Sequence, residues 1–383
     1  MSRISVLIAD ADAWTALPVA HCLKASGRVT VHGFSATTAT PSRYSSLFTT
    51  YHCLGETFHR DLWLDQIGRT IKKHGIDIVM PTADFAIRTL SEQRERLGWT
   101  AKLVQLPDVG TFDTATNKAS LAGFLASNGF PQPPSAVVTA GRPADNSLSS
   151  LTFPVLVKPP LSNDGKGIRR VENRGDFDAF LASRPDGDPW VVQTLIEGHD
   201  LGVSVLCGDG EVIASAEQHA LVPSREAFKP AVGIEFGYES SATDLVKKLM
   251  RELGWSGVAN IDLRIASDTD IPLILEVNGR YWSTLLGSLK AGVNFPLLAC
   301  ETALGEVRSN RIARRARYFA GAHSILMSVS GGGADRIRPG ETSLYQLLRD
   351  PVPPASRLLS RLLSASPLSR LPIAKVGVHP IIR

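Results

Sequence analysis

The chain has 383 residues, of which 43% are hydrophobic and 20% are charged, and its formal net charge is +4. These values are typical of a globular protein with two or three domains, and a mild, scattered positive charge gives no reason to expect nucleic-acid binding. The four cysteines lie far apart, which argues against a zinc knuckle and against a disulfide framework. The N-terminus turns acidic too early for a signal peptide and no run reaches transmembrane length, so we expect a cytoplasmic protein.

The first 110 residues predict an α/β domain with an open parallel sheet. Ile4 to Ala9 is predicted to be a buried strand, the residues from Leu17 to Leu23 have helical spacing, and Val29 to Gly33 is the next predicted strand. The turn after the first strand, Asp10-Ala11-Asp12, lacks the glycines that let a pyrophosphate approach. No dinucleotide site is therefore expected there.

A later strand of the same domain, Ile76 to Pro81, is followed by Thr82 and Asp84. The strand ends of an open α/β sheet line its crevice, so both side chains are candidates for contact with a substrate. The start of a helix explains them equally well.

Two lysines occupy positions where a positive charge needs a partner. Lys118 opens a helix that runs to Asn128, and the helix dipole disfavours a cation at that end. Lys158 closes an otherwise apolar strand within Phe153 to Pro160, where a buried ammonium requires an anion. Bound phosphate would satisfy both lysines, although solvation would also serve Lys118.

A glycine-containing loop, Ser162-Asn163-Asp164-Gly165-Lys166-Gly167, follows that strand at once. Its glycines allow backbone N–H groups to close on phosphate, whereas a Gly-Lys-Gly turn by itself is more often a simple hairpin. The succession of lysine strand, glycine loop and next strand favours phosphate binding.

The strand that begins at Trp190 leads into a linker with polar groups. Its residues include Gln193, Thr194 and Ile196, and Asp200 follows. Such a linker can offer backbone groups to an adenine edge while Asp200 accepts from ribose hydroxyls. Taken alone, Gln193 and Asp200 are ordinary polar residues of a strand end and a turn.

The stretch Ile274 to Arg280 predicts a metal site at the end of a strand. Alternation places Glu276, Asn278 and Arg280 on one face, with Leu275 and Val277 packed inward. An isolated triplet of this kind would instead be the exposed face of an edge strand.

A second carboxylate favours the metal site over the exposed face of an edge strand. Asp262 lies in the apolar run Val258 to Arg264, and the turn Ser267 to Asp270 predicts a hairpin that pairs it with Glu276. Two carboxylates so close repel each other unless a cation lies between them. We therefore expect Mg²⁺, with Mn²⁺ as an alternative.

In this order, the lysines, the glycine loop, the linker and the two carboxylate strands resemble the ATP-grasp superfamily, which includes D-alanine:D-alanine ligase, biotin carboxylase and glycinamide ribonucleotide synthetase. The resemblance runs from about Phe112 to Leu304. More narrowly, the sequence resembles a poorly characterised group of predicted ATP-grasp carboxylate-amine ligases in four segments: Leu7 to Asp12, Ser42 to Tyr44, Asn278 to Leu285 and Ala291 to Pro296. Two departures are Asn163-Asp164, where a second glycine is often found, and Gly279, which replaces a common proline.

The resemblance implies four regions: a Rossmann-like pre-ATP-grasp domain (1–110), the small lobe (111–190) and large lobe (191–310) of an α+β ATP-grasp fold, and a C-terminal extension (311–383). It also implies the site residues. ATP phosphates would bind Lys118, Lys158 and the loop residues Ser162, Gly165, Lys166 and Gly167; adenine would bind Gln193, Thr194 and Ile196, and ribose Asp200. Mg²⁺ would bind Asp262, Glu276 and Asn278, and Arg280 would act with Lys158 on the transferred phosphoryl group.

The implied activity is that of an ATP-dependent ligase, which activates a small carboxylate as an acyl phosphate for attack by an amine. Carboxylation through carboxyphosphate is an alternative, although the chain has no biotin carrier motif, and a non-catalytic nucleotide-binding regulator is another. Eight residues are candidates for substrate contact, with a structural role equally open to each: His219, Arg225, Lys229, Arg264, Tyr281, Trp282, Ser283 and Thr284.

The C-terminal part is basic. Arg308 to Arg317 contains five arginines, for which a solvated helix face is favoured over an acidic partner. The segment Ser356 to Leu363 alternates arginines with leucine pairs, and no acidic residue follows Asp350. We expect its leucines to pack on the body of the protein or on a second subunit of a homodimer, with an anionic membrane surface as the alternative.

Overall fold

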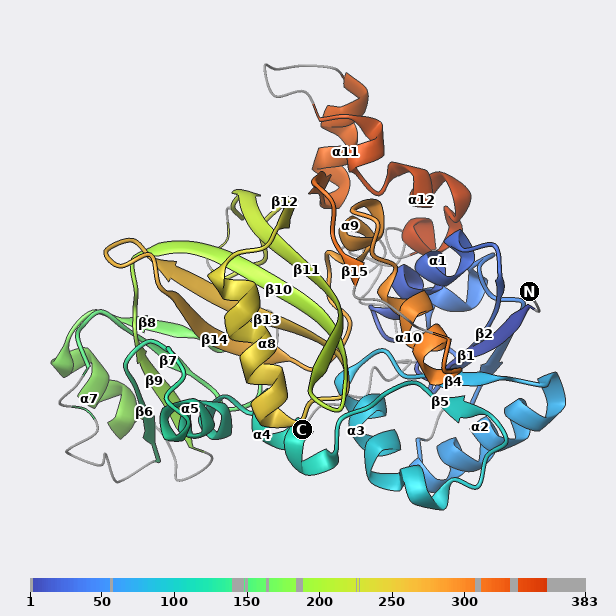
Figure 1. The fold of residues 1–383 in the computed structure, drawn as a ribbon, viewed down its shortest axis with the longest axis horizontal. Helices are drawn as coiled ribbons and strands as arrows, with labels where there is room; N and C mark the ends of the chain where they lie inside the picture. The colour runs from blue at the N-terminus through green and yellow to red at the C-terminus, as the bar shows by residue number, and fades with distance from the viewer. Residues whose placement is uncertain are drawn as a thin grey trace, which may run out of the picture.

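The computed structural model in Figure 1 describes residues 3–55, 58–139, 148, 151–162, 165–183, 189–224, 226, 228–306, 311–330 and 337–356. These residues form three sheets joined by helices. Several sequence predictions concern residues outside the described ranges: Asn163, Asp164, Arg225, Arg308 and the tail beyond Ser356.

The N-terminal sheet is parallel throughout, with the strand order β3-β2-β1-β4-β5. The chain moves outward from β1 to β3 and returns through α2 to β4 beside β1, so the direction of winding reverses between β1 and β4. This predicted open parallel sheet is confirmed. Its elements are β1 (Ile4–Ile8), α1 (Ala16–Ala25), β2 (Val29–Ser35), η1 (Pro41–Tyr44), β3 (Thr50–Cys53), α2 (Arg60–His74), β4 (Ile78–Met80), α3 (Asp84–Gln93), η2 (Arg94–Arg96) and β5 (Lys102–Leu103).

A small antiparallel sheet with the order β6-β9-β7-β8 follows two helices. Its buried side chains, among them Val155, Val157, Phe177 and Val192, form a core of their own. The elements are α4 (Val109–Thr116), α5 (Lys118–Ser127), β6 (Ser135–Val138), β7 (Val155–Lys158), β8 (Arg169–Val171), α7 (Arg174–Ala182) and β9 (Trp190–Thr194).

The large sheet has the order β14-β13-β10-β11-β12-β16, and β15 pairs with β11. Figure 1 shows α8 lying along its long, twisted strands. The buried residues of this sheet and of the N-terminal sheet form one continuous core. The elements are β10 (Gly198–Gly208), β11 (Glu211–Val222), β12 (Gly233–Tyr238), α8 (Ser241–Leu253), β13 (Gly257–Ala266), β14 (Pro272–Asn278), α9 (Leu285–Lys290), α10 (Phe295–Ala303), β15 (Arg311–Ile312) and β16 (Ala316–Phe319).

The C-terminal segment packs back on the N-terminal domain. After α11 (Gly321–Ser330), η3 (Pro339–Glu341) and α12 (Leu344–Arg349), the buried Asp350 accepts hydrogen bonds from Ser45 Oγ at 2.6 Å and from Ser46 N at 2.9 Å. In the described part of the chain, no helix combines the length and apolarity needed to cross a bilayer.

The predicted region boundaries remain predictions, but the pairing of two strands bears on them. β9 pairs within the small sheet as far as Thr194, beyond the predicted end of the small lobe at residue 190. β15 and β16, expected in the C-terminal extension, pair with β11 and β12 of the large sheet. Arg311 and Arg317 therefore lie in strands, and Arg315 lies between those strands, in place of the expected helix face.

Candidate functional site

The predicted hairpin forms and brings two carboxylates together. β13 and β14 are antiparallel, with Asp262 directly opposite Glu276 and Asn260 opposite Asn278. Asp262 accepts hydrogen bonds from both amides, through Oδ1 from Asn260 Nδ2 at 2.8 Å and through Oδ2 from Asn278 Nδ2 at 3.0 Å. The amides thus fix the orientation of this carboxylate.

One detail of the predicted packing is wrong. The β13–β14 register shifts between Asp262 and Leu263, so that Leu263 pairs with Ile274 and Leu275 has no partner. Ile274 and Val277 are consequently the buried side chains, whereas Leu275, expected to pack inward, is half-buried. A bulge of this kind re-aims the side chains that follow it.

The two carboxylates of this pair, Asp262 and Glu276, repel each other. Burial, together with repulsion by Glu276, raises the pKa of Asp262 to about 7, against the opposing effects of the Asn260 hydrogen bond and of Arg280. A cation would relieve that repulsion. No cluster of three or more histidine, cysteine, aspartate or glutamate residues suited to a metal occurs among the described residues.

Both predicted lysines lie at this site. Lys118 begins α5, where Asn117 caps the helix, and its Nζ lies 3.4 Å from Glu276 Oε2 and donates to the Ser162 carbonyl at 2.9 Å. Lys158 ends β7, is 7% exposed, and donates to Gln193 Oε1 at 2.5 Å. Burial lowers the pKa of Lys158 to about 8, while the attraction of Glu276 opposes that shift. The charge of both lysines is directed at the carboxylates.

The glycine loop contains an unsatisfied donor. The Ser162 Oγ is buried and has no hydrogen-bond partner in the described part of the chain. Gly165 and Gly167 have φ of 71° and 78°, the left-handed region that favours glycine. A Cβ on Gly165 would lie 2.6 Å from the carbonyl oxygen of Phe228, so the loop packs against the segment between β11 and β12. Lys166 is exposed.

The predicted linker is held by Arg264. This side chain donates from Nε to the Ile196 carbonyl at 3.0 Å and from Nη1 to Asp200 Oδ1 at 2.7 Å. Gln193 instead turns inward, since it also donates to Ser135 Oγ at 2.9 Å, and Thr194 Oγ1 accepts from Thr152 N at 3.1 Å. Arg264, a candidate for substrate contact, thus has contacts that position the linker.

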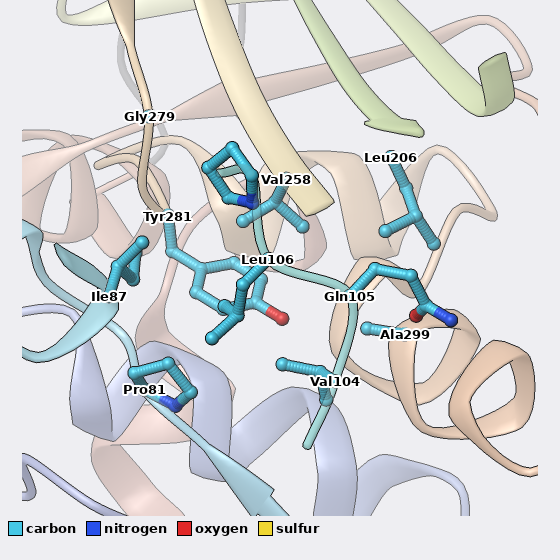
Figure 2. Close-up of a pocket in the computed structure, with 11 residues that line it drawn as sticks. Pro81, Ile87, Val104, Gln105, Leu106, Leu206, Val258, Gly279, Tyr281 and Ala299 are labelled. Carbon is cyan, nitrogen blue, oxygen red and sulfur yellow. The ribbon is translucent and has the colours of Figure 1, made fainter. Parts of the chain in front are cut away.

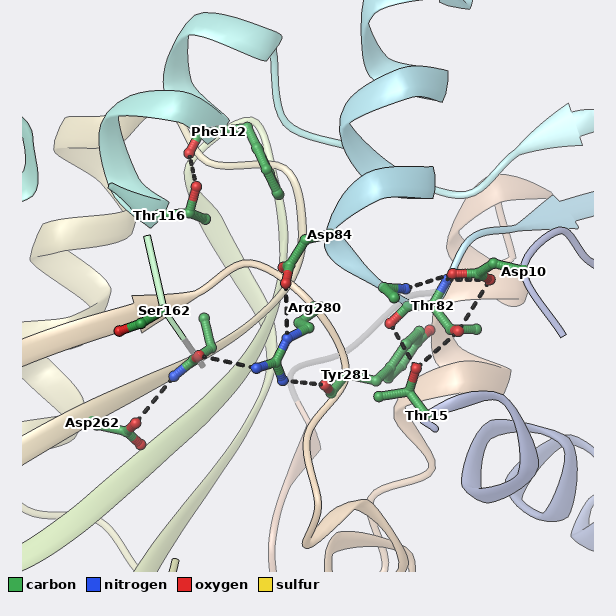
Figure 3. Close-up of polar contacts among 12 residues, drawn as sticks. Asp10, Thr15, Thr82, Asp84, Phe112, Thr116, Ser162, Asp262, Arg280 and Tyr281 are labelled. Carbon is green, nitrogen blue, oxygen red and sulfur yellow. Dashed lines mark hydrogen bonds and ion pairs between the residues drawn. The ribbon is translucent and has the colours of Figure 1, made fainter. Parts of the chain in front are cut away.

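Arg280 connects the hairpin with the N-terminal domain, as Figure 3 shows. Its side chain is almost buried; Nε donates to Asp84 Oδ2 at 3.1 Å, Nη1 to the Tyr281 carbonyl at 3.2 Å and Nη2 to Asn278 Oδ1 at 3.5 Å. The guanidinium also lies over the ring of Trp14, 5.2 Å from its centroid. Sequence reasoning placed Asp84 in the crevice but did not connect it with Arg280.

The other candidates for substrate contact differ in whether their hydrogen bonds lead to the carboxylate pair. Thr284 donates to Gln218 Oε1 at 2.6 Å, and Gln218 in turn donates to Asn260 Oδ1 at 3.2 Å. His219 shares a face of β11 with Glu217, which accepts from Ser240 and Thr243 at the start of α8; the structure therefore does not bring His219 to the carboxylates. Ser283 and Lys229 are exposed, whereas Tyr281 and Trp282 are buried.

Residues missed by the sequence analysis support the site. Asn260 bridges Asp262 to Gln218, and alternation along β13, which puts Asn260 and Asp262 on one face, would have identified it. Gly202 lies between Asp262 and Gln218 in the sheet, and a Cβ there would lie 2.7 Å from Gln218 Nε2. Because Gly202 has no side chain, it leaves room for the Gln218 side chain that bonds to Asn260.

Thr82, a candidate for substrate contact, takes part in hydrogen bonds within the N-terminal domain. Asp10 accepts from Thr82 N and Oγ1 and from Ala83 N, and Thr15 Oγ1 lies 2.9 Å from Thr82 Oγ1. Burial raises the pKa of Asp10 to about 7. These bonds join the loop after β1 to the start of α3.

A pocket beneath the Arg280 segment is shown in Figure 2. It is lined by apolar side chains of the N-terminal domain and the large sheet, together with Gly279, Tyr281 and Gln105. None of its lining residues is charged, so it does not suit phosphate or a metal.

The resemblance to the ATP-grasp superfamily predicted from the sequence is confirmed by a family model and by solved structures of the same fold. More narrowly, residues 186–320 match the family model described as ATP-grasp in the biosynthetic pathway with Ter operon.

Relatives and solved structures agree on the fold. The large chain of carbamoyl phosphate synthase from Thermomicrobium roseum is 28% identical over 182 residues, 45% of this chain and 17% of that protein. The biotin carboxylase domain of 2-oxoglutarate carboxylase from Hydrogenobacter thermophilus, solved with MgADP and bicarbonate, has a TM-score of 0.63 and 16% identity, covering 83% of this chain and 74% of that chain. L-amino acid ligase from Bacillus licheniformis has a TM-score of 0.58 and 17% identity, covering 83% and 79%. The chain spans about a fifth of the length of the curated relatives it matches.

Proposed function

We propose that this protein is an ATP-dependent carboxylate-amine ligase, which converts a small carboxylate to an acyl phosphate and passes the acyl group to an amine. One observation carries the proposal. Lys118 and Lys158, at the edge of the small lobe, face Asp262 and Glu276 on the large sheet, with Lys118 Nζ 3.4 Å from Glu276 Oε2. Facing cations and carboxylates of this kind suit a metal-bound polyphosphate between two lobes.

The donor atoms fit Mg²⁺. Two carboxylates and the amide oxygen of Asn278 are hard oxygen ligands, and Mg²⁺ commonly binds one or two carboxylates and completes its shell with waters and substrate phosphates. The raised pKa of Asp262 is the expected sign of a carboxylate pair built to face a cation. When bound, the ion would neutralise charge on the phosphates; Mn²⁺ has the same ligand preference.

The groups around the hairpin fit ATP as the phosphoryl donor. Ser162 Oγ is a buried donor that a phosphate oxygen would satisfy, and Gly165 and Gly167 leave their backbone N–H groups accessible to phosphate. The Ile196 and Asp200 region, positioned by Arg264, is proposed to receive the adenosine part.

The residues would act by position and charge. Lys158 and Arg280 would stabilise charge on the phosphoryl group as it moves from ATP to the carboxylate oxygen, leaving ADP. The amine nitrogen then forms the bond to the acyl carbon, phosphate leaves with the electrons of the broken C–O bond, and the nitrogen loses a proton to solvent. Closure of the Ser162 to Gly167 loop would exclude water from the acyl phosphate.

The first test is direct binding of MgATP. The dissociation constant is measured by titration calorimetry with and without Mg²⁺ for the wild type, Glu276→Gln and Lys158→Met. We expect both variants to weaken binding at least about tenfold. Lys247→Met, which removes a half-buried lysine of α8 paired with Asp244, is the matched control and should bind like the wild type. Wild-type binding that ignores Mg²⁺, or unchanged affinity in both site variants, would refute the proposal.

The second test is ADP release from MgATP with pools of amino acids, sugar acids, small peptides and bicarbonate. Release that requires an organic acid and an amine together supports a ligase. Release with bicarbonate alone would replace it with the carboxyphosphate reading, and nucleotide binding without any release would indicate a regulatory protein.

A further inference from the structure

Arg280 is unusual in depending on another domain for its orientation. It follows β14 of the large sheet, yet its Nε donates to Asp84 of the N-terminal domain. The Arg280 side chain is 7% exposed and that of Asp84 37% exposed. The contact is therefore charge-assisted, and it is largely shielded from solvent on the arginine side.

The two sides of the guanidinium are held differently. Asp84 fixes its Nε edge, while the ring of Trp14 covers its face at 5.2 Å from the centroid. On the hairpin side, the contact to Asn278 Oδ1 is a long 3.5 Å. The N-terminal domain thus contributes a charged contact and an aromatic surface to the guanidinium.

The segments that carry Asp84 and Trp14 are joined behind the site. Trp14 precedes Thr15, whose hydroxyl lies against Thr82, and Asp10 accepts from the backbone of Thr82 and Ala83, directly before Asp84. Asp84 is also the first residue of α3, where a carboxylate is favoured by the helix dipole. These hydrogen bonds therefore connect the segment that carries Trp14 with the segment that carries Asp84. The connection lies at the point between β1 and β4 where the winding of the sheet reverses.

The structure assigns to Asp84 the role of a positioning residue: by holding the Arg280 guanidinium against Trp14, the N-terminal domain sets the orientation of the arginine that faces the transferred phosphoryl group. The part of this role that concerns the phosphoryl group rests on the proposed function, whereas the orientation rests on the contacts of Arg280 with Asp84 and Trp14. Asp84 does not itself contact the reacting atoms in this role. Its loss should affect the transfer step and leave nucleotide binding, which uses the lysines and carboxylates, unaltered.

The first experiment reads the orientation without any activity. The Nε–Hε resonance of Arg280 is assigned in ¹⁵N-labelled protein by its disappearance in Arg280→Lys. In Asp84→Asn we expect this resonance to shift and broaden, because its charged acceptor is lost. Asp113→Asn is the matched control, since it breaks the exposed pair of Arg88 on the same helix α3, 2.7 Å between the charged atoms, and should move the Arg88 resonance alone. An Arg280 resonance that is unchanged in Asp84→Asn would overturn the inference.

The second experiment measures steady-state ADP release with the most active acceptor pool. We expect Asp84→Asn to lower kcat at least about tenfold, as a small misplacement of a catalytic group does, with the KM for MgATP changed less than about twofold. In the Arg280→Lys background the same substitution should have no further effect, because a residue that acts through Arg280 has nothing left to position. If the two substitutions lowered kcat by independent factors that multiply in the double variant, the positioning role of Asp84 would be overturned. If the wild type releases no ADP with any pool, the proposed function fails, and the resonance of Arg280 still decides whether Asp84 orients it.

Discussion

Lys158 shows how burial prepares a single residue for an anionic ligand. A lysine at the end of an apolar strand is disfavoured as a cation unless partners compensate, and here the compensation is partial: Gln193 accepts its hydrogen bond and Glu276 attracts its charge, yet its pKa still falls to about 8. Phosphate oxygens would complete the compensation. The residue is therefore both stabilised by the site and available to a ligand.

The pKa of Lys158 predicts a pH dependence of nucleotide affinity. The protonated form of Lys158 binds phosphate, so the affinity for MgATP should fall as the pH rises through about 8. Because the unfolded chain keeps this proton to a higher pH, the free energy of unfolding should rise over the interval between the two pKa values.

The measurement is a series of calorimetric titrations from about pH 6.5 to about pH 9.5. Lys158→Arg is the control, because a guanidinium stays charged throughout this range and should remove the fall in affinity. Identical profiles for the two proteins would show that another group titrates.

At the scale of elements, the glycine loop depends on a close approach between two segments. Gly165 has a left-handed backbone and lies against the carbonyl of Phe228, on the segment between β11 and β12. These two segments come from different lobes, so their contact bears on how the phosphate region is covered.

Gly165→Ala is expected to weaken MgATP binding. The added Cβ costs about 1 kcal/mol of backbone strain and also meets the Phe228 carbonyl at 2.6 Å, which forces the loop to move. Gly129→Ala has a comparable φ of 66° and no neighbouring atom within 4 Å, so it carries the strain without the contact. Dissociation constants and thermal unfolding midpoints are compared; equal affinities in the two variants would argue against the loop's role.

The elements were largely predictable from sequence because their signals are local. Alternation marked Glu276, the Ser267 to Asp270 turn predicted its pairing with Asp262, and the apolar runs placed β1, β2 and β4. The bulge at Leu275 was not predictable, since one unpaired residue leaves no trace in the spacing.

The contacts between distant segments were equally out of reach. The bond of Arg280 to Asp84 depends on how separate sheets dock, and the turning of Gln193 toward Lys158 depends on the pairing of β9 with β7. No local pattern states either. The orientation of His219 away from the carboxylates follows from the register of β11, where each residue's face is set by strands far along the chain.

At the scale of the whole molecule, the buried hydrophobic side chains are divided into two clusters. Side chains of the N-terminal sheet and the large sheet pack into one cluster, whereas the small antiparallel sheet and α7 have a separate one. A lobe with its own core can open without unfolding the rest.

Phe177→Ala is therefore expected to destabilise the small lobe selectively. Phe177 is 1% exposed in the separate cluster, and removing such a ring costs about 3–5 kcal/mol. Amide hydrogen exchange should accelerate in β6 to β9 while β1 and β10 keep their protection. Phe236→Ala, in the continuous cluster, is the control and should accelerate exchange in the large and N-terminal sheets together. Uniform acceleration by Phe177→Ala would contradict the division.

The shared core has a consequence for recombination between homologous chains. A chimera that takes its first hundred residues from another family member would have to reproduce the apolar contact surface against the large sheet as well as a carboxylate opposite Arg280. Exchanging the segment from β6 to β9, whose buried side chains form the separate cluster, requires neither. Crossover points on either side of β6 to β9 should thus yield folded hybrids more often than a crossover between β5 and α4.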